Sequence, residues 1–295
     1  MLTKQVLIDS DPATGEPNRD VDDGLAFLLL LASTDIQVRG ITINFGNVSA
    51  DRGYQVAKNL LDLAHLDIPV YKGAASKSDL GRPNPAVDYL IETVRATPGE
   101  ISLLALGPLT NIATAMMLDP GFAPNLRELV VMGGSLHFKP FSIFGEFNLH
   151  LDGQAASIAL SAPVQKTLIT MDVCSKAVFR QEHLRMLENH DSPISRYLVK
   201  AISPWLDLNR KVFFRAQGFF PWDVVAAAYL IEKTLFDENL CSLSVQKTGL
   251  RSGRIENCQP YDPTQPGDGS LPVNIPMELD TQRFMPHFLS SLLKF

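Results

Sequence analysis

The strongest constraint on the fold is a regular alternation of two kinds of apolar segment. Short apolar runs typical of buried strands fall at residues 5–8, 38–43, 68–73, 101–106 and 128–134. Segments typical of helices lie between them, at 22–33, 49–66, 86–96 and 109–118. Strands that alternate with helices predict an α/β fold with an open, mostly parallel sheet and helices on both faces.

Chain length and charge narrow the possibilities further. A chain of 295 residues is within the range of one α/β domain, so we expect a single domain over residues 1–295. Apolar residues make up 45% of the sequence and charged residues 20%, which is ordinary for a globular protein with a sizeable core. The formal net charge of −6 argues against a nucleic-acid surface, which usually carries a basic patch, and favours a small neutral or cationic ligand.

The cysteines and the N-terminus favour a cytoplasmic protein. Cys174, Cys241 and Cys258 are odd in number and lack CxxC spacing, so buried reduced thiols are favoured over a disulfide framework, a zinc cluster or a catalytic thiol. The N-terminus reaches charged residues too early for a signal-peptide core. The longest apolar run, residues 24–32, has about half the length of a membrane span, so no membrane partner is expected.

Five aspartates crowd around the end of the first strand: Asp9, Asp11, Asp20, Asp22 and Asp23. In open α/β sheets, ligands bind beyond the carboxyl ends of the strands, where this cluster lies. Carboxylates this close need a countercharge, and Ca²⁺ prefers several oxygen ligands. The alternative is that these residues are helix caps and solvated loop charges. An EF-hand loop counted from Asp9 is excluded, since it places Thr14 where glycine is required.

A phosphatase is a competing interpretation. Residues 9–14, DSDPAT, also resemble the DxDxT motif of haloacid-dehalogenase-type phosphatases, whose first aspartate is the nucleophile. That interpretation leaves the tight VDD at residues 21–23 and the polar motifs after the other strands without a role.

Several motifs in a fixed order decide between these interpretations. They are IDSDP (8–12), DVDDG (20–24), ITINFGN (41–47), LGPLTN (106–111), MGG (132–134), GEFNLH (145–150) and WDVV (222–225). Together they resemble the inosine-uridine-preferring nucleoside hydrolase family over roughly residues 5–235, with the C-terminal part similar only in outline. The resemblance implies the nucleoside hydrolase fold with a Rossmann-like core, Ca²⁺-dependent hydrolysis of ribonucleosides to ribose and free base, and a homodimer or homotetramer.

The resemblance also implies a metal site. Asp11 would bind Ca²⁺ and act as the general base on a water held by the metal. Asp23 would be a bidentate ligand, and Asp223 and the main-chain carbonyl of Leu106 would complete the shell. Hydrolysis passes through an oxocarbenium-like sugar, which negative charge beneath the ring stabilises.

Further residues would hold the ribose hydroxyls by the same resemblance: Asp22, Asn47, Glu146 and Asn148. Asp22 and Asp23 are adjacent at a helix start, where side chains point about 100° apart, so that one can face the metal and the other the sugar. Asp9 would support the first turn.

Two departures from the family pattern bear on the substrate. The insertion Ala13–Arg19 brings Glu16 or Arg19 near the site, or forms a solvated loop. The loop after Gly73 is short and lacks the histidine that many relatives place over the base. If a lid is missing, an alternative function remains: a member of the family that binds nucleosides without turnover, or that cleaves an unusual riboside.

Aromatic residues favour a purine nucleoside. Trp222 stands where nonspecific members carry histidine, and Phe147 lies within the GEFN motif. Each would stack on the base, or else pack in the core. His137 and His150 are candidates to protonate the leaving base, although isolated histidines are more often structural.

Two other segments have an open role. The phenylalanines at 213–214 and 219–220 line the base pocket or pack the core, and residues 249–254 bind a phosphate or form a surface turn. Residues 259–272 are expected to form a loop before a final helix at 284–294.

Overall fold

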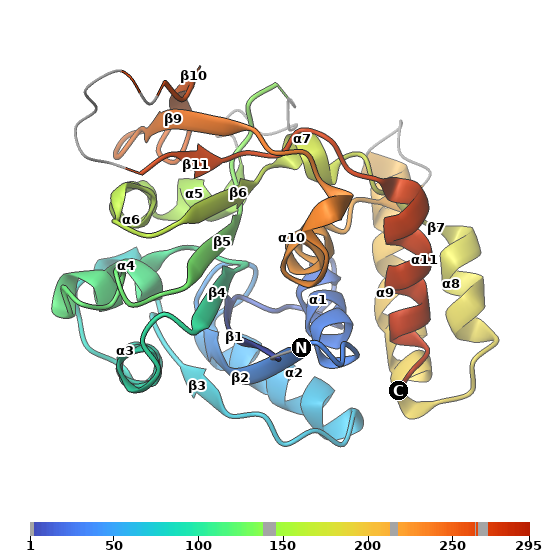
Figure 1. Cartoon of the computed structure of the whole chain (residues 1–295). Helices are drawn as coiled ribbons and strands as arrows, with labels where there is room; N and C mark the ends of the chain where they lie inside the picture. The colour runs from blue at the N-terminus through green and yellow to red at the C-terminus, as the bar shows by residue number, and fades with distance from the viewer. Residues whose placement is uncertain (1–2, 138–145, 213–217, 263, 265–270) are drawn as a thin grey trace.

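A nine-stranded sheet forms the centre of the computed structural model, which describes residues 3–137, 146–212, 218–262, 264 and 271–295 (Figure 1). Its order is β10-β9-β11-β6-β5-β4-β1-β2-β3. The strands are β1 (Lys4–Ser10), β2 (Ile36–Ile43), β3 (Val70–Lys72), β4 (Ile101–Ala105), β5 (Glu128–Met132), β6 (Lys166–Ile169), β9 (Leu240–Val245), β10 (Ile255–Pro260) and β11 (Val273–Asn274). A separate pair joins β7 (Phe179–Arg180) to β8 (Gly218–Phe219).

The predicted parallel character of the sheet is confirmed. Seven neighbouring strands, from β11 through β6, β5, β4, β1 and β2 to β3, pair in parallel. Among the described strands of this sheet, only β9 is reversed: it pairs antiparallel with β11 on one side and, as a hairpin, with β10 on the other.

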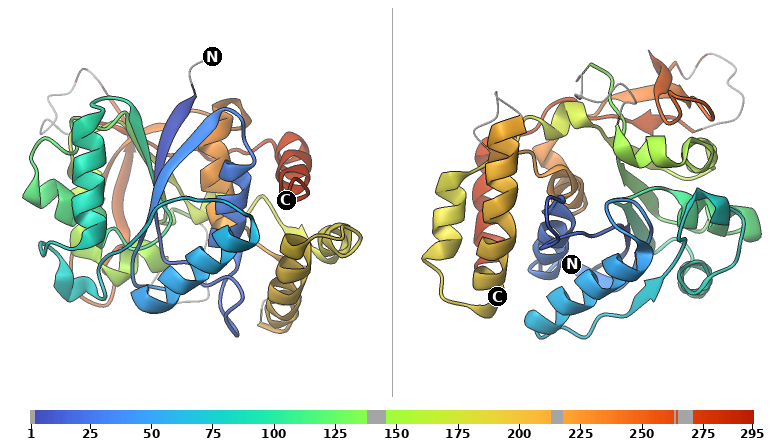
Figure 2. Two further views of the ribbon diagram at one scale, coloured as in Figure 1. Left: turned by 90° about the horizontal axis from the view of Figure 1, so that it is seen from below. Right: turned by 180° about the vertical axis from the view of Figure 1, so that it is seen from behind.

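Helices cover both faces, as predicted (Figures 1 and 2). One face carries α1 (Asp22–Leu31), α2 (Ala50–Leu63), α7 (Met171–Cys174), α8 (Gln181–Glu188), α9 (Pro193–Val212), α10 (Trp222–Ile231) and α11 (Thr281–Leu292). The other carries α3 (Pro85–Ala96), α4 (Thr110–Leu118), α5 (Phe147–Leu151) and α6 (Gly153–Ser161). Short 3-10 turns lie at η1 (Lys77–Asp79) and η2 (Lys233–Leu235).

The two faces explain why the central strands are apolar throughout. On β1, Val6 and Ile8 are buried in the core beneath α1 and α10, whereas Leu7 points into the core beneath α3 and α4. Successive side chains of a strand alternate between faces, so a strand covered on both sides needs an unbroken apolar run.

The ends of several strands and helices differ from the ranges expected from the sequence. The third strand covers only Val70–Lys72, and the second helix ends at Leu63. The expected loop at 259–272 begins with the last two residues of β10. The final helix starts earlier, at Thr281, because Asp280 caps it by accepting from the Arg283 amide.

The strand order reverses direction at β1. From β1 the chain moves outward to β2 and β3, then returns to place β4 on the other side of β1. The loops after β1 and β4 therefore diverge, and ligands of open α/β sheets bind at such a reversal. Among the described residues, no helix has the length and apolar character to cross a membrane.

Candidate active site

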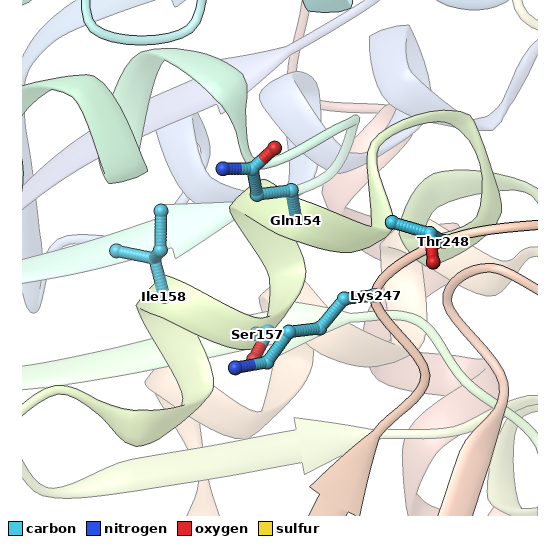
Figure 3. A pocket seen from close by; sticks show the side chains of 5 residues that line it. All are labelled: Gln154, Ser157, Ile158, Lys247 and Thr248. Atoms are coloured by element: carbon cyan, nitrogen blue, oxygen red, sulfur yellow. The ribbon is translucent and has the colours of Figure 1, made fainter.

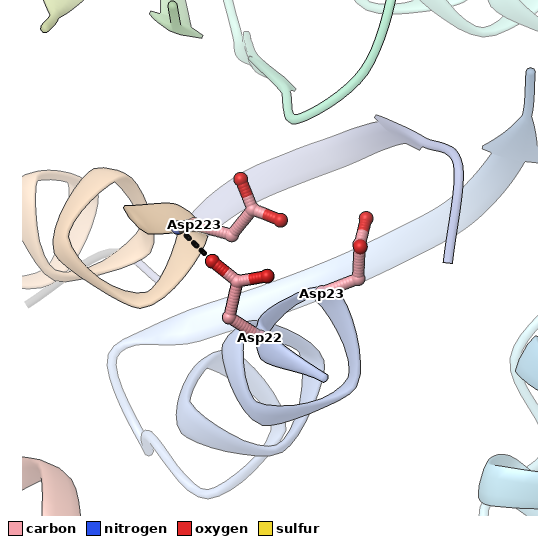
Figure 4. A group of neighbouring side chains, drawn as sticks. All are labelled: Asp22, Asp23 and Asp223. Carbon is pink, nitrogen blue, oxygen red and sulfur yellow. Dashed lines mark hydrogen bonds between the residues drawn. The ribbon is translucent and has the colours of Figure 1, made fainter. Parts of the chain in front are cut away.

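Two helix N-termini meet at the carboxyl end of β1 and bring three carboxylates together (Figure 4). Asp22 and Asp23 open α1, and Asp223 lies in the first turn of α10. One carboxylate oxygen from each lies within 4.8 Å of the other two. The Asp223 amide donates to Asp22 Oδ2 at 3.0 Å, which fixes the two helices against each other. Both helix dipoles favour negative charge here.

Asp11 follows β1 and is completely buried. Its Oδ2 accepts from the Asn47 amide at 2.6 Å, whereas no described residue gives Oδ1 a hydrogen bond. A Cβ on Gly46 would lie 1.8 Å from Oδ2, and one on Gly107 would lie 2.8 Å from Oδ1. These two glycines let the loops after β2 and β4 close on the carboxylate.

Asp23 is held in a similar way. Ser10, the last residue of β1, donates its hydroxyl to Asp23 Oδ1. Asp23 Oδ2 is buried and has no hydrogen-bond partner among the described residues. Two buried carboxylates with one free oxygen each are costly unless a ligand takes those oxygens.

Burial and mutual repulsion raise the pKa values of the cluster. Burial, with the charge of Asp22, raises the pKa of Asp23 to about 7. Burial raises the pKa values of Asp11 and Asp223 well above the usual range, and neighbouring aspartates add to both shifts. A bound cation would favour the charged forms and remove this cost.

Asp9 has a different environment from the cluster. Its carboxylate accepts from Thr42 Oγ1 at 2.6 Å and Asn111 Nδ2 at 2.8 Å, with Asn44 Nδ2 at 3.5 Å. Asn111 also accepts from the Ala74 amide at 2.9 Å, so Asp9 ties β1 to β2, α4 and the loop after β3. With both oxygens engaged by buried neighbours, Asp9 is not placed as a phosphatase nucleophile.

Glu146 and Asn148 lie at the start of α5, beyond β5. Glu146 caps the helix by accepting from the amides of Asn148 and Leu149, at 2.7 and 2.9 Å. Asn148 Nδ2 donates to the carbonyl oxygens of Leu106 at 3.0 Å and Met132 at 3.2 Å. The carbonyl of Leu106 thus faces the site from the end of β4.

The structure groups the acidic residues somewhat differently from the sequence expectation. Asp23 and Asp223 come together as expected, but Asp22, expected at the ribose, joins them, whereas Asp11 lies outside this close group. The reason is the packing of α1 beside α10, which brings the adjacent Asp22 and Asp23 together to Asp223.

The aromatic candidates divide between surface and core. The Phe147 side chain at the start of α5 is 46% exposed. Trp222 lies against Phe220, with ring centroids 4.8 Å apart. Phe219 is buried and stacks on Phe179, so it packs the core. Residues 213–214 lie outside the described residues.

The two histidine candidates for protonating the base, His137 and His150, contact residues outside the acidic cluster. The His137 amide donates to Asp172, and its side chain is exposed. The His150 ring is 2.8 Å from the Ser252 carbonyl, within the segment 249–254, which forms the turn of the β9–β10 hairpin. The three cysteines are free thiols. Cys174 is buried, and its thiol donates a hydrogen bond to the main-chain carbonyl of Trp222.

The insertion Ala13–Arg19 has a structural role that the sequence did not indicate. Thr14 Oγ1 accepts from the Gly24 amide at 3.1 Å and so caps α1 from outside the helix. The Tyr197 hydroxyl donates to the Thr14 carbonyl at 2.6 Å, which joins the insertion to α9. Glu16 pairs with Arg52 at 2.6 Å, and Arg19 is exposed.

Ser10 and Thr14 support the candidate site, by contacts to Asp23 and to the start of α1, and sequence reasoning missed both. Their only signal is position, since each is a small hydroxyl residue next to the acidic cluster. The short loop after Gly73 forms the turn η1, and Asp79 there accepts from the amides of Ala75 and Ser76.

Comparison with known proteins identifies the family. The model of the inosine-uridine preferring nucleoside hydrolases matches residues 6–286. The chain belongs to this family. Membership makes this nucleoside hydrolase an enzyme that acts on N-glycosyl bonds and supports the predicted hydrolysis of ribonucleosides.

Individual relatives are distant but extend over most of the chain. A probable uridine nucleosidase of Oryza sativa is 24% identical, with 98% of this chain and 96% of that protein covered. A pyrimidine-specific ribonucleoside hydrolase of Escherichia coli is 28% identical over 65% of this chain and 67% of its own length.

Solved structures confirm the nucleoside hydrolase fold. A plant nucleoside hydrolase is 25% identical with a TM-score of 0.88, covering 99% of both chains. A purine-preferring ribonucleoside hydrolase from Gardnerella vaginalis is 22% identical with a TM-score of 0.86, covering 98% of both.

Proposed function

We propose that this nucleoside hydrolase uses Ca²⁺ and Asp11 to cleave ribonucleosides to ribose and free base. The observation that carries the proposal is a pair of buried oxygens, on Asp11 and Asp23, that accept no hydrogen bond from the described part of the chain and lie beside the Asp22–Asp223 contact. Those oxygens lie at the carboxyl end of β1, the region where open α/β sheets bind ligands. A set of carboxylates and a carbonyl is the donor set that Ca²⁺ prefers.

Asp23, Asp223, Asp11 and the Leu106 carbonyl would hold the ion, with Asp22 as a further oxygen donor. When bound, Ca²⁺ would supply positive charge that orients a water and makes it more acidic. Asp11 would take the proton from that water at Oδ1, because Oδ2 is already held by the Asn47 amide. The fixed orientation of the carboxylate supports its role as general base.

The sugar would bind against the residues that border the cluster. Asn47, Glu146 and Asn148 come from the loop after β2 and the start of α5, on opposite sides of Asp11 in the strand order. Their oxygen and nitrogen atoms would accept from and donate to the ribose hydroxyls. The acidic cluster beneath would stabilise the positive charge that develops on the ring.

We further propose a preference for purine bases. The exposed ring of Phe147 and the Phe220–Trp222 pair would stack on the base, and a purine offers the larger face. The curated relatives above are named for uridine or pyrimidine nucleosides, so uridine is the decisive comparison.

The test is release of reducing sugar from inosine, guanosine, adenosine, uridine and cytidine, with Ca²⁺ or with chelator. Asp11→Asn should abolish release, while Asp237→Asn, which alters a carboxylate that caps the Met277 and Glu278 amides, should not. A higher kcat/KM for uridine than for inosine would refute the purine preference alone. If none of the nucleosides is cleaved under any condition, the proposed hydrolysis is refuted and a binding role remains.

Three other predictions stay open. A single domain over residues 1–295, a cytoplasmic location and a homodimer or homotetramer each follow from the sequence and the family resemblance. Light scattering on the purified protein would measure the oligomeric state directly.

A further inference from the structure

The turn of the β9–β10 hairpin lies against α5, the short helix that begins beside Glu146 (Figure 1). Gly253 in this turn has a φ of +78°, and a Cβ built there would lie 2.0 Å from both the carbonyl carbon and oxygen of Leu149. It would also lie 2.3 Å from the His150 amide nitrogen. The hairpin backbone therefore touches the α5 backbone with no side chain between them.

A hydrogen bond supports the same contact. The His150 Nδ1 atom is 2.8 Å from the Ser252 carbonyl oxygen. Since a carbonyl only accepts, Nδ1 carries the proton. This bond joins the residue after Leu149 to the residue before Gly253, so two adjacent positions of α5 are held by two adjacent positions of the turn.

The next helix closes on the turn as well. A Cβ on Gly153, the first residue of α6, would lie 2.2 Å from Ser252 Oγ and 2.7 Å from the Gly253 nitrogen. The turn itself is fixed, because the Gly253 amide donates to the Gln246 carbonyl at 2.8 Å. Ser252 and Gly253 thus fit between the end of α5 and the start of α6.

Farther along α6, the hairpin and the helix are separated. A groove of about 320 Å³ separates them, lined by Gln154, Ser157, Ile158, Lys247 and Thr248 (Figure 3). The close contact is therefore confined to the base of the turn, where a Cβ on Gly153 would also lie 2.8 Å from the Gln246 carbonyl oxygen.

The helix α5 depends on such support. It has five residues, and a helix this short is unstable alone in water. Its first turn carries Asn148, which reaches the carbonyl of Leu106, and its cap is Glu146. A shift of α5 therefore moves both proposed ribose-binding residues together.

We propose that Ser252 and Gly253 are positioning residues that hold α5, and through it Glu146 and Asn148, at the ribose site. The proposal rests on the proposed function. It assigns to the segment 249–254 a task other than phosphate binding. The aspartates of the cluster lie on other elements, α1, α10 and the loop after β1, and Asn148 reaches only the Leu106 carbonyl among the proposed metal ligands. Positioning therefore acts mainly on the sugar.

The same turn supplies a matched pair of variants. Gly249 has a φ of +86°, close to that of Gly253, but a Cβ there would meet only Gln246 Nε2 at 3.9 Å. Alanine at either position has a similar backbone cost, since both adopt the left-handed conformation. Only Gly253→Ala introduces a collision with α5.

We expect Gly253→Ala to lower kcat/KM for the best ribonucleoside by roughly 10- to 100-fold, mainly through KM, because small misplacements of binding groups have effects of this size. The Kd for Ca²⁺, measured by calorimetry, should change by less than KM does, because the proposed aspartate ligands lie on other elements. Gly249→Ala should behave like the wild type in both assays. His150→Phe keeps an aromatic ring but removes Nδ1 and its hydrogen bond to Ser252, and should raise KM by roughly 2- to 10-fold. This variant tests the contact if Gly253→Ala does not fold.

Amide hydrogen exchange separates this proposal from the hydrolase itself. The amides of Asn148 and Leu149, which donate to Glu146, should exchange faster in Gly253→Ala than in Gly249→Ala, whether or not any nucleoside is cleaved. Equal exchange in the two alanine variants, or a KM unchanged in both His150→Phe and Gly253→Ala, would overturn the positioning role. Absence of wild-type turnover would overturn only the proposed function.

Discussion

Removal of the Ser10 hydroxyl should weaken metal binding without unfolding the protein. Ser10 is completely buried at the end of β1 and donates to Asp23 Oδ1, leaving Oδ2 as the free oxygen. In Ser10→Ala, Asp23 loses the hydrogen bond that orients its carboxylate, and its charged form loses a donor. The side chain becomes only slightly smaller, so the β1 backbone and its pairings with β2 and β4 should remain.

The size of the effect follows from the chemistry of the bond. A hydrogen bond to a charged group contributes about 1.5–3 kcal/mol, and each 1.4 kcal/mol is a factor of about ten in a dissociation constant. We therefore expect the Kd for Ca²⁺ to rise by roughly 10- to 100-fold, a range also typical for the loss of residues that orient metal ligands.

Calorimetric titration of the chelator-treated protein with Ca²⁺ measures this directly. Ser102→Ala is the matched control, because Ser102 is an equally buried serine on the neighbouring β4 that donates to a carboxylate, Glu128, at 2.8 Å. An unchanged Ca²⁺ affinity in Ser10→Ala, or an equal loss in Ser102→Ala, would refute the reasoning.

Three further perturbations follow from the same site. Burial raises the pKa values of Asp9 and Asp23 from 3.8 to about 7, so the unfolded chain loses these protons at a lower pH than the folded protein. The free energy of unfolding of the metal-free protein should therefore fall as pH rises from about 4 to 7, on the order of 4 kcal/mol per group. Urea unfolding with chelator at pH 5 and pH 7.5 checks this, and equal stability at the two pH values contradicts it. Asp223→Asn replaces a carboxyl group whose charged form is opposed by burial and by the neighbouring aspartates. The melting temperature without metal should therefore rise, while stabilisation by added Ca²⁺ shrinks; a lower melting temperature without metal argues against this cost. Gly46→Ala places a Cβ 1.8 Å from Asp11 Oδ2, and should lower kcat by roughly 100-fold in the reducing-sugar assay; near-normal turnover would mean that Asp11 tolerates displacement.

The sequence predicted the parts of the molecule that depend on local pattern. The strand and helix alternation and the polar residues after β1, β2, β4 and β5 gave the sheet and the edge at which Asp11 and Asp23 lie. Those features follow from periodicity and from the chain order of parallel strands, which a sequence displays directly.

The remaining parts depend on contacts between distant segments. Whether Asp22 or Asp11 joins Asp23 and Asp223 depends on how closely α1 and α10 pack, and periodicity carries no such distance. The helix α9 contains Pro204, which obscures a helical pattern in sequence. The role of Gly253 appears only when the hairpin meets α5.

The contact between α1 and α10 has a consequence for biosynthesis. Asp22 and Asp223 are 201 residues apart in sequence, yet the amide of one is hydrogen bonded to the carboxylate of the other. A chain emerging from the ribosome carries the first aspartates early, but cannot assemble the full acidic group until α10 has been synthesised and has packed beside α1. Nascent chains should therefore neither retain the proposed Ca²⁺ nor cleave nucleosides, and metal retention would report completed folding.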